Sequence, residues 1–267
     1  MADTERAFAA RALVVGWKQS FLEFFADSAV GFDGAAGPAR DQIRRNPDPP
    51  AGFQLLWEPR FGDISASGDL GFLTGPVTSI NPARQPATRY STYASVWKRQ
   101  ADGTFKVVID VGATAPGPVE FAPGLMRADR SDRYIGNDTM DAATRALEAA
   151  DLSLTRTTRV RQSIAYTGLI PIDGRLHRPG VMPLIGEPAA RAWLAGQLAY
   201  SETLPRFAEV ARSRDLGYTW GTYRIPTVLL RGGGSTTGES GFYARVWVRT
   251  RDGAWKVALD VVQPGAP

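Results

Sequence analysis

The sequence predicts two successive domains of the α+β class, each with helices first and an antiparallel sheet afterwards. The main observation is an internal duplication, because residues 59–75 return as 205–221 and residues 93–111 return as 243–261. The copies are 146 residues apart in the first block and 150 in the second, so four residues are inserted, most simply within 232–238. A repeat of this length is a whole domain and not a solenoid unit. In both copies, moreover, helical patterns end where strand patterns begin.

The first half of copy one has the pattern of helices. Asp3 or Thr4 can cap a helix, Gly16 interrupts it, and phenylalanines gather near one face of its continuation. A proline-rich loop over 46–52 ends this half. The expected elements are helices over 4–15, 17–26 and 38–45, and a strand over 28–32.

The second half of copy one has the pattern of strands. The last two are joined by Asp102-Gly103, which is a strong signal for a hairpin turn, and copy two carries Asp252-Gly253 at the same place. The expected strands of copy one are 61–66, 70–80, 90–100 and 105–111.

Copy two repeats the order, with helices over 138–152 and 187–200, an extended piece around 170–176, and four strands. Between the copies, residues 113–124 are rich in proline and small side chains, which is typical of a linker. The first domain is therefore expected to span 1–124, including this linker, and the second 125–267.

The strands of the sheet are apolar on both faces. Along 93–97 and 105–109, apolar residues occupy both alternation positions, whereas a sheet with one wet face would alternate cleanly. One face is expected to pack on its own helices around a pocket. The other is expected to pack on the sheet of the second copy, which would make the chain an internal pseudo-dimer.

The composition excludes several classes of protein. With 43% hydrophobic and 22% charged residues the chain is globular, and no apolar run approaches the length of a membrane span. The net charge is only +4 and the arginines are scattered, so neither nucleic acid nor a membrane is an expected partner. Without cysteine, and with the single His177 beside two arginines, no metal site and no cofactor are expected.

The compartment stays open. The N-terminus shows no cationic region followed by an apolar stretch, so no signal peptide is visible. We expect a soluble protein that is cytoplasmic if Met1 is native, and periplasmic or secreted if a signal peptide has been removed.

Each copy closes with the pattern W-x-R-x-x-D-G-x-W/F-K-V-x-x-D after a helix, helix, strand, helix order. Together with 68–72 and 215–218, this pattern resembles the SnoaL-like branch of the nuclear-transport-factor-2-like superfamily, in particular its ketosteroid-isomerase-like bacterial members. The likeness covers the C-terminal half of each copy. It implies two cystatin-like, cone-shaped domains with N-terminal helices packed on a curved antiparallel sheet. It says little about chemistry, because the superfamily holds isomerases, cyclases, dehydratases and non-catalytic binders.

Two carboxylates are candidate catalytic residues. The stretch around Asp33 is similar to the one that places the general base in the ketosteroid isomerases, and Asp63 lies on a strand with apolar neighbours. The oxyanion hole of those isomerases has no evident counterpart, because the first helix lacks a tyrosine and the strand over 90–100 lacks an acid. We therefore expect a turn or capping role for Asp33 and a surface position for Asp63.

Large aromatic side chains on the strands could line a pocket for a flat apolar ligand, or they could simply fill the core. These candidate pocket residues are Trp57, Phe72, Tyr93 and Trp97 in copy one, and Tyr218, Trp220, Tyr243 and Trp247 in copy two. Asp110 and Asp260 recur in both copies, and a role in the shared fold is expected, such as capping or pairing with Arg99 or Arg249.

The leading hypothesis is a non-catalytic protein that binds a small apolar molecule, with one pocket per copy, of which one can have decayed into scaffold. An alternative is a cofactor-free isomerase or cyclase that acts on a polyketide-like or steroid-like ketone through Asp33 or Asp63. A third is a protein-interaction module whose pockets are filled. An inward carboxylate beside a phenol would favour the enzyme, and a purely apolar cavity the binder. The identity of the ligand and any further homo-oligomerisation stay open.

Overall fold

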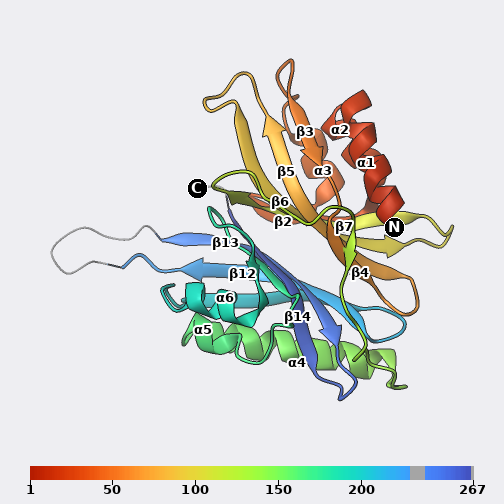
Figure 1. The fold of residues 1–267 in the computed structure, drawn as a ribbon, viewed down its shortest axis with the longest axis vertical. Helices are drawn as coiled ribbons and strands as arrows, with labels where there is room; N and C mark the ends of the chain where they lie inside the picture. The colour runs from red at the N-terminus through yellow and green to blue at the C-terminus, as the bar shows by residue number, and fades with distance from the viewer. Residues whose placement is uncertain (229–237, 266–267) are drawn as a thin grey trace. The chain divides into compact units, whose positions relative to one another are not determined.

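The computed structural model describes residues 1–228 and 238–265, and it confirms the α+β class of both copies (Figure 1). The chain divides into two compact units. Unit 1 holds residues 1–128 together with 178–183, and unit 2 holds 129–177 and the described residues from Leu184 onward. The insertion expected within 232–238 falls almost wholly outside the described residues.

Three helices begin unit 1: α1 (Ala2–Val15), α2 (Trp17–Phe24) and α3 (Ala39–Arg45). Gly16 separates the first two, as expected, and adopts a φ of 82°, a backbone conformation that side chains with a Cβ rarely adopt. The aromatic rings of the first two helices meet, with ring centroids of Phe8 and Phe21 4.8 Å apart. The helical pair thus presents an apolar face to the sheet.

The sheet of unit 1 has the strand order β2-β1-β7-β6-β5-β4-β8, with β3 also paired to β5. Strands β5, β6 and β7 form the antiparallel meander, and β1 runs parallel to β7. The strands are β1 (Phe25–Asp33), β2 (Ala35–Pro38), β3 (Gln54–Trp57), β4 (Phe61–Ile64), β5 (Leu70–Ile80), β6 (Thr88–Arg99), β7 (Phe105–Ala115) and β8 (Met126–Arg127).

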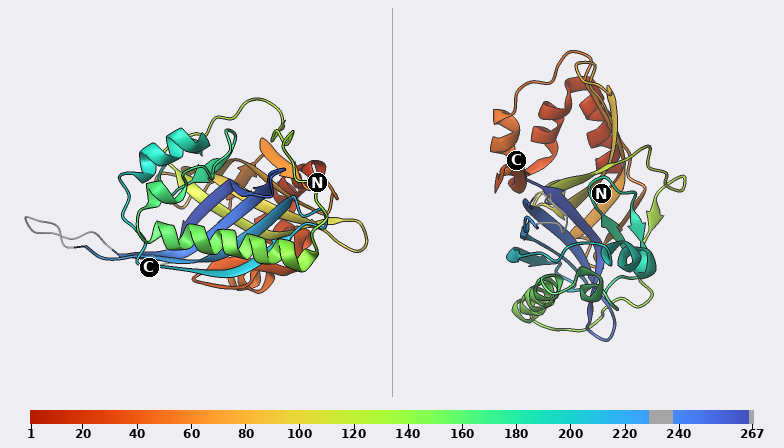
Figure 2. Two further views of the ribbon diagram at one scale, coloured as in Figure 1. Left: turned by 90° about the horizontal axis from the view of Figure 1, so that it is seen from below. Right: turned by 90° about the vertical axis from the view of Figure 1, so that its left-hand side faces the viewer.

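Unit 2 repeats this topology with the strand order β10-β9-β14-β13-β12-β11, in which β9 runs parallel to β14. Its long helix α4 lies along one face of the sheet (Figure 2). The elements are α4 (Met140–Thr158), α5 (Gln162–Ala165), β9 (Arg175–His177), β10 (Leu184–Ile185), α6 (Gly186–Leu194), β11 (Glu202–Val210), β12 (Leu216–Ile225), β13 (Glu239–Arg249) and β14 (Trp255–Pro264).

Several boundaries differ from the expected ones. Helix α4 continues to Thr158 because Leu154, Thr155 and Thr158 are buried and so extend its inner face. Strand β7 continues to Ala115, into the segment expected to be linker, since it stays paired to β6. Strand β3, which the sequence analysis missed, is held by pairing with β5 and not by a pattern of its own.

Alternation along the meander separates the side chains into two sets. In unit 1, Tyr93, Ser95 and Trp97 share the face of the sheet that meets the helices, where Phe8 and Trp97 join one core. In unit 2, Tyr243, Arg245 and Trp247 occupy the same register positions. A register shift before Trp97 recurs before Trp247, so both copies keep the same bend. The packing of one sheet on the other stays a prediction.

Candidate functional site

Three equivalent positions in the two units form buried polar clusters. In unit 1, Ser95 on β6 is the direct partner of Asp110 on β7. In unit 2, Arg245 on β13 is the direct partner of Asp260 on β14. The first helix of each unit adds an acid, because the offset of 146 residues carries Glu5 onto Asp151. We call these the unit 1 cluster (Glu5, Ser95, Asp110) and the unit 2 cluster (Asp151, Arg245, Asp260).

Glu5 of the unit 1 cluster is completely buried on α1. Its Oε1 accepts a hydrogen bond from Trp57 Nε1 and its Oε2 accepts one from Trp97 Nε1, both at 2.7 Å. Burial, and secondarily the nearby Asp110 carboxyl, raise the pKa of Glu5 to about 8 in spite of these hydrogen bonds. The carboxyl therefore holds its proton to neutral pH or above.

Asp110 is the second acid of the unit 1 cluster. Ser95 Oγ donates a hydrogen bond of 2.6 Å to Asp110 Oδ2. Burial raises the pKa of Asp110 to about 7, against the lowering effect of that hydrogen bond. Part of the Asp110 surface remains accessible because the residue lines a cavity. Two carboxyls with pKa values near neutrality thus share one apolar site.

The cavity of unit 1 has a volume of about 160 Å³. Most of its wall is apolar, but the buried Tyr93 and the carboxyl of Asp110 face it as well. The Tyr93 hydroxyl has no hydrogen-bond partner among the described residues, although its oxygen is inaccessible to solvent. The residues that line the cavity are Phe8, Phe21, Leu55, Trp57, Val77, Ser91, Thr92, Tyr93, Asp110 and Gly112.

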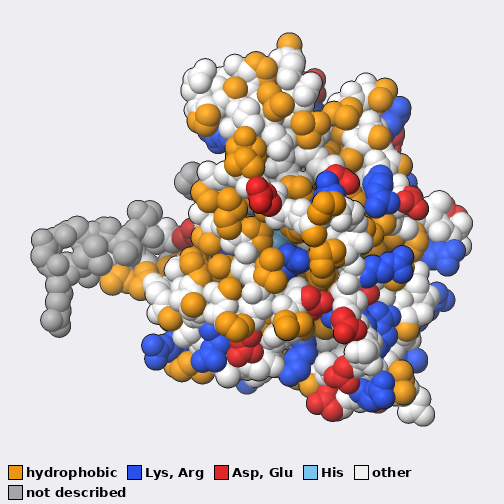
Figure 3. Space-filling model, in the orientation of Figure 1, with side chains coloured by type: hydrophobic (Ala, Val, Ile, Leu, Met, Phe, Trp, Pro, Cys, Tyr) orange, Lys and Arg blue, Asp and Glu red, His pale blue; other side chains and the backbone are white. Residues whose placement is uncertain are grey.

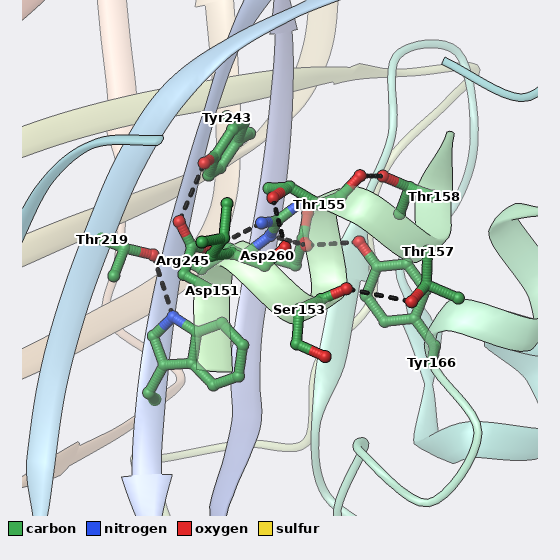
Figure 4. A network of polar contacts seen from close by, with 12 residues as sticks. Asp151, Ser153, Thr155, Thr157, Thr158, Tyr166, Thr219, Tyr243, Arg245 and Asp260 are labelled. Atoms are coloured by element: carbon green, nitrogen blue, oxygen red, sulfur yellow. Dashed lines mark hydrogen bonds and ion pairs between the residues drawn. The ribbon is translucent and has the colours of Figure 1, made fainter. Parts of the chain in front are cut away.

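The unit 2 cluster contains its own cation. Arg245 lies between two acids, with its Nη1 2.6 Å from Asp151 Oδ1 and its Nε 2.8 Å from Asp260 Oδ2 (Figure 4). All three side chains are at most 1% exposed. Tyr243 donates a hydrogen bond to Asp151, and Tyr166 donates one to Asp260. Burial raises the pKa of Tyr243 above its ordinary value, so this phenol stays protonated.

Larger side chains occupy the cavity positions in unit 2. Val77 corresponds to Tyr223, and Gly112 corresponds to Val262, at the same register positions beside the central tyrosine. Tyr223, Val262 and Tyr243 pack together in one apolar cluster with Tyr200. The volume that is open in unit 1 is therefore taken up by side chains in unit 2.

Each unit also has a groove between its first helix and a strand of the sheet. These grooves have volumes of about 340 Å³ in unit 1, beside α1 and β3, and about 310 Å³ in unit 2, beside α4 and β11. Because both units have one, the grooves follow from the shared fold and do not distinguish the two sites.

Neither predicted catalytic aspartate lines the cavity. Asp33 is exposed at the end of β1, where its backbone N–H donates to Gln42 Oε1, which holds the turn between β1 and β2. Asp63 is buried and not at the surface, which corrects the expectation. Its direct partner on β5 is Phe72, which places it on the sheet face opposite Leu73 and the helices.

Of the predicted pocket aromatics, the structure brings Trp57 and Tyr93 together at the cavity of unit 1. Trp97 and Trp247 belong to the cores, and Tyr243 belongs to the unit 2 cluster. Alternation places the remaining three on the sheet face opposite the helices: Phe72, Tyr218 and Trp220.

The acids pair differently from the expectation. Asp260 pairs with Arg245 and not with Arg249. Asp110 accepts a hydrogen bond from Ser95 and does not pair with Arg99. The Nε of Arg99 donates instead to the Gly103 carbonyl. The sequence analysis also missed Glu5. Its signal was present in the offset of 146 residues, which aligns one acid with another on the first helix of each copy.

Charged side chains of both signs are intermixed on the face of the molecule drawn in Figure 3. Among the described residues, no three His, Cys, Asp or Glu side chains are grouped as a metal site would need. Nor does any helix of the described segments have the length and apolar composition needed to cross a membrane.

No protein-family model matches the chain, and no curated protein matches it. Solved structures are similar to about half of it. One is a ketosteroid isomerase-like protein from Erwinia carotovora atroseptica SCRI1043, with 15% identity and a TM-score of 0.41, and the match covers 46% of this chain and 97% of that one.

Two other solved structures are also similar to about half of this chain. A nuclear transport factor 2-like superfamily protein from Salmonella enterica serovar Typhimurium LT2 has 11% identity and a TM-score of 0.39, with 48% of this chain and 95% of that one covered. An uncharacterised protein with a cystatin-like fold from Caulobacter vibrioides has 12% identity and a TM-score of 0.38, with 47% and 92% covered.

Proposed function

We propose that unit 1 binds a small molecule with an apolar body and one polar end, and that unit 2 is a closed copy that serves as scaffold. The observation that carries this proposal is the largely apolar cavity of unit 1, which is lined by Asp110 and by Tyr93, whose hydroxyl has no hydrogen-bond partner in the described structure. A volume of about 160 Å³ suits a ligand of single-ring size, since a cavity of about 150 Å³ accommodates benzene. The two polar groups would orient such a ligand.

The test uses benzyl alcohol as the probe and NMR chemical shifts of the full chain as the readout. We expect the largest changes in chemical shift at Tyr93, Asp110 and their neighbours when benzyl alcohol is added. Gly112→Val, which copies the valine found at this position in unit 2, should abolish them by filling the cavity. Shifts confined to other regions, or unchanged by Gly112→Val, would contradict the proposal. Native mass spectrometry of the protein from its producing cells would then identify a co-purifying molecule.

A second candidate is a cofactor-free isomerase or cyclase, and one observation favours it. The pKa of Asp110, raised to about 7 by burial, suits a group that moves a proton near neutral pH, and the Tyr93 phenol beside it could donate to a ligand oxygen. In this candidate Asp110 replaces Asp33 and Asp63 as the acid–base group. Hydrogen–deuterium exchange of cyclohexanone at the carbon next to its carbonyl tests it, because Asp110→Asn should abolish any acceleration that the protein gives.

A further inference from the structure

The unit 2 cluster shows what this constellation of residues binds best. Its guanidinium is held by three kinds of contact at once: an ion pair to Asp151, an ion pair to Asp260, and stacking on the Tyr243 ring at 3.9 Å from its centroid. A planar cation suits such a site, because its N–H groups reach both carboxylates while its face lies on the ring.

The unit 1 cluster has the same anionic and aromatic parts but lacks the cation. Ser95 stands where Arg245 stands, and its neutral hydroxyl brings no charge to the acids. The hydrogen-bond partners of Glu5 and Asp110 are two tryptophans and Ser95, and no Lys or Arg is among them in the described part of the chain. Two acids are thus buried without a compensating charge.

Space for a cation exists beside two of the corresponding groups. The cavity of unit 1 is bounded by Asp110 and by Tyr93, the counterparts of two groups that hold the guanidinium in unit 2. Tyr93 is 5% exposed, and its hydroxyl lacks a partner in the described structure, whereas the Tyr243 hydroxyl donates to Asp151. Gly112 leaves open the volume that Val262 fills in unit 2.

From this comparison we infer that the polar end of the unit 1 ligand is a planar organic cation, a guanidinium or an amidinium, bound between Asp110 and the ring of Tyr93. Asp110 and Tyr93 are the counterparts of two groups that hold the Arg245 side chain in unit 2, and the apolar walls of the cavity hold the body of the ligand. The inference rests on the proposed function, because it names the chemical class of the ligand for the same cavity.

The affinity for such a cation should increase with pH. The ionisable groups at the site are Glu5 on α1, Tyr93 on β6 and Asp110 on β7, and the other charged groups that act on Tyr93 are Glu58 and Arg6. A cation binds the ionised carboxylates, and these form as pH rises through the raised pKa values of about 7 and about 8. A neutral ligand that accepts hydrogen bonds from the protonated acids would show the opposite trend.

The experiment compares benzamidinium with benzamide and benzoate, which have nearly the same shape but are neutral and anionic. Binding to the full chain is measured by isothermal titration calorimetry at about pH 6 and about pH 8.5. We expect benzamidinium to bind at least about tenfold more tightly than benzamide at the higher pH, where one good charge contact of about 1.4 kcal/mol gives that factor. Its affinity should rise between the two pH values.

Two variants separate this inference from the proposed function. Asp110→Asn should weaken benzamidinium by at least about tenfold and leave benzamide unchanged, which also shows that the cavity is still formed. Gly112→Val should abolish the binding of both. The cation inference would be overturned if benzamide bound as tightly as benzamidinium, or if the affinity for benzamidinium fell as pH rises. Either result would still support the proposed function, the binding of a small molecule in the cavity. No binding of any of the three probes would overturn both.

Discussion

The two units of this chain share a topology, yet unit 2 pairs its two buried acids with a cation and unit 1 buries two acids that have none among their hydrogen-bond partners. In unit 2, Arg245 neutralises Asp151 and Asp260, and large side chains close the space around the cluster. In unit 1, Ser95 stands at the arginine position and a cavity remains. Since both units derive from one duplicated sequence, the difference comes from the residues that changed at these positions.

The cores of the two units also differ in the side chains that surround the buried acids. Unit 1 surrounds its acids with aromatic rings, and the indoles of Trp57 and Trp97 donate to Glu5. Unit 2 has a core that is richer in leucine and alanine, and the Trp247 indole donates to Thr219. Indole donors can hold a carboxyl in either protonation state but bring no charge. The ionisation of the unit 1 cluster therefore changes near neutral pH.

The largest expected effect comes from removing the cation of unit 2. Arg245→Ser copies the residue of unit 1 and leaves two acids buried without a counter-charge, so we expect the free energy of unfolding of unit 2 to fall by about 3–5 kcal/mol. Urea unfolding followed by hydrogen exchange in unit 2 peptides measures it. Methylguanidinium should restore part of the loss. A loss below about 1 kcal/mol, similar to that expected for Ser95→Ala, would mean that the ion pairs do not stabilise unit 2.

The next effect concerns the pH dependence of unit 1. Burial raises the pKa of Glu5 from 4.5 to about 8 and that of Asp110 from 3.8 to about 7, so the folded unit binds more protons than the unfolded chain between these values. Its stability should accordingly fall as pH rises from about 4 to about 8, by more than the roughly 1.4 kcal/mol that one pKa unit represents. Hydrogen exchange in unit 1 peptides across this range measures the slope.

The double variant Glu5→Gln with Asp110→Asn is the control for that slope. It keeps side chains of similar shape but removes both titrating groups, and the fall in stability with pH should largely disappear. A slope that persists in the double variant would assign the pH dependence to other residues.

A smaller effect is expected from giving unit 1 the arginine of unit 2. Ser95→Arg should lower the pKa of Asp110 and of Glu5 by more than about one unit, because a buried cation favours the ionised carboxylates. Carbon-13 NMR of the two carboxyls measures both pKa values. Ser95→Gln is the matched control, since it adds a long polar side chain without charge. Equal shifts in both variants would show that packing, and not charge, moves the pKa values.

The smallest effect is expected at the aspartate that the superfamily resemblance pointed to. Asp33→Asn changes an exposed side chain in a turn, so the stability should stay within about 0.5 kcal/mol of the original and binding in the cavity should be unaffected. Calorimetry with benzyl alcohol measures the second point. A loss of binding in this variant would show that Asp33 contributes to the binding site.

Much of the fold could be predicted from sequence because its signals are local or repeated. The break at Gly16, the hairpin turns at Asp102-Gly103 and Asp252-Gly253, and the order of helices and strands follow from caps, turns and periodicity. Strand β3 has no such local signal, since it depends on its pairing with β5. The continuation of β7 to Ala115 likewise depends on a neighbouring strand.

The candidate site could be predicted only in part. Trp57 and Tyr93 were named from their size and position, but Phe72, Tyr218 and Trp220 have the same composition signal and lie on the other sheet face. A shift of one residue along a strand reverses the face, and the sequence of an all-apolar strand does not show which alternation set meets the helices.

The sequence by itself determined that the chain is two copies of one α+β domain, because duplication and secondary-structure patterns are properties of the chain alone. Only the tertiary structure decided that Glu5 meets Asp110 across more than a hundred residues of chain, that Arg245 lies between two acids, and that one unit keeps a cavity while the other closes it. The physical reason is that burial and the pairing of charges arise from residues far apart in sequence. Their raised pKa values therefore exist only once the chain has folded.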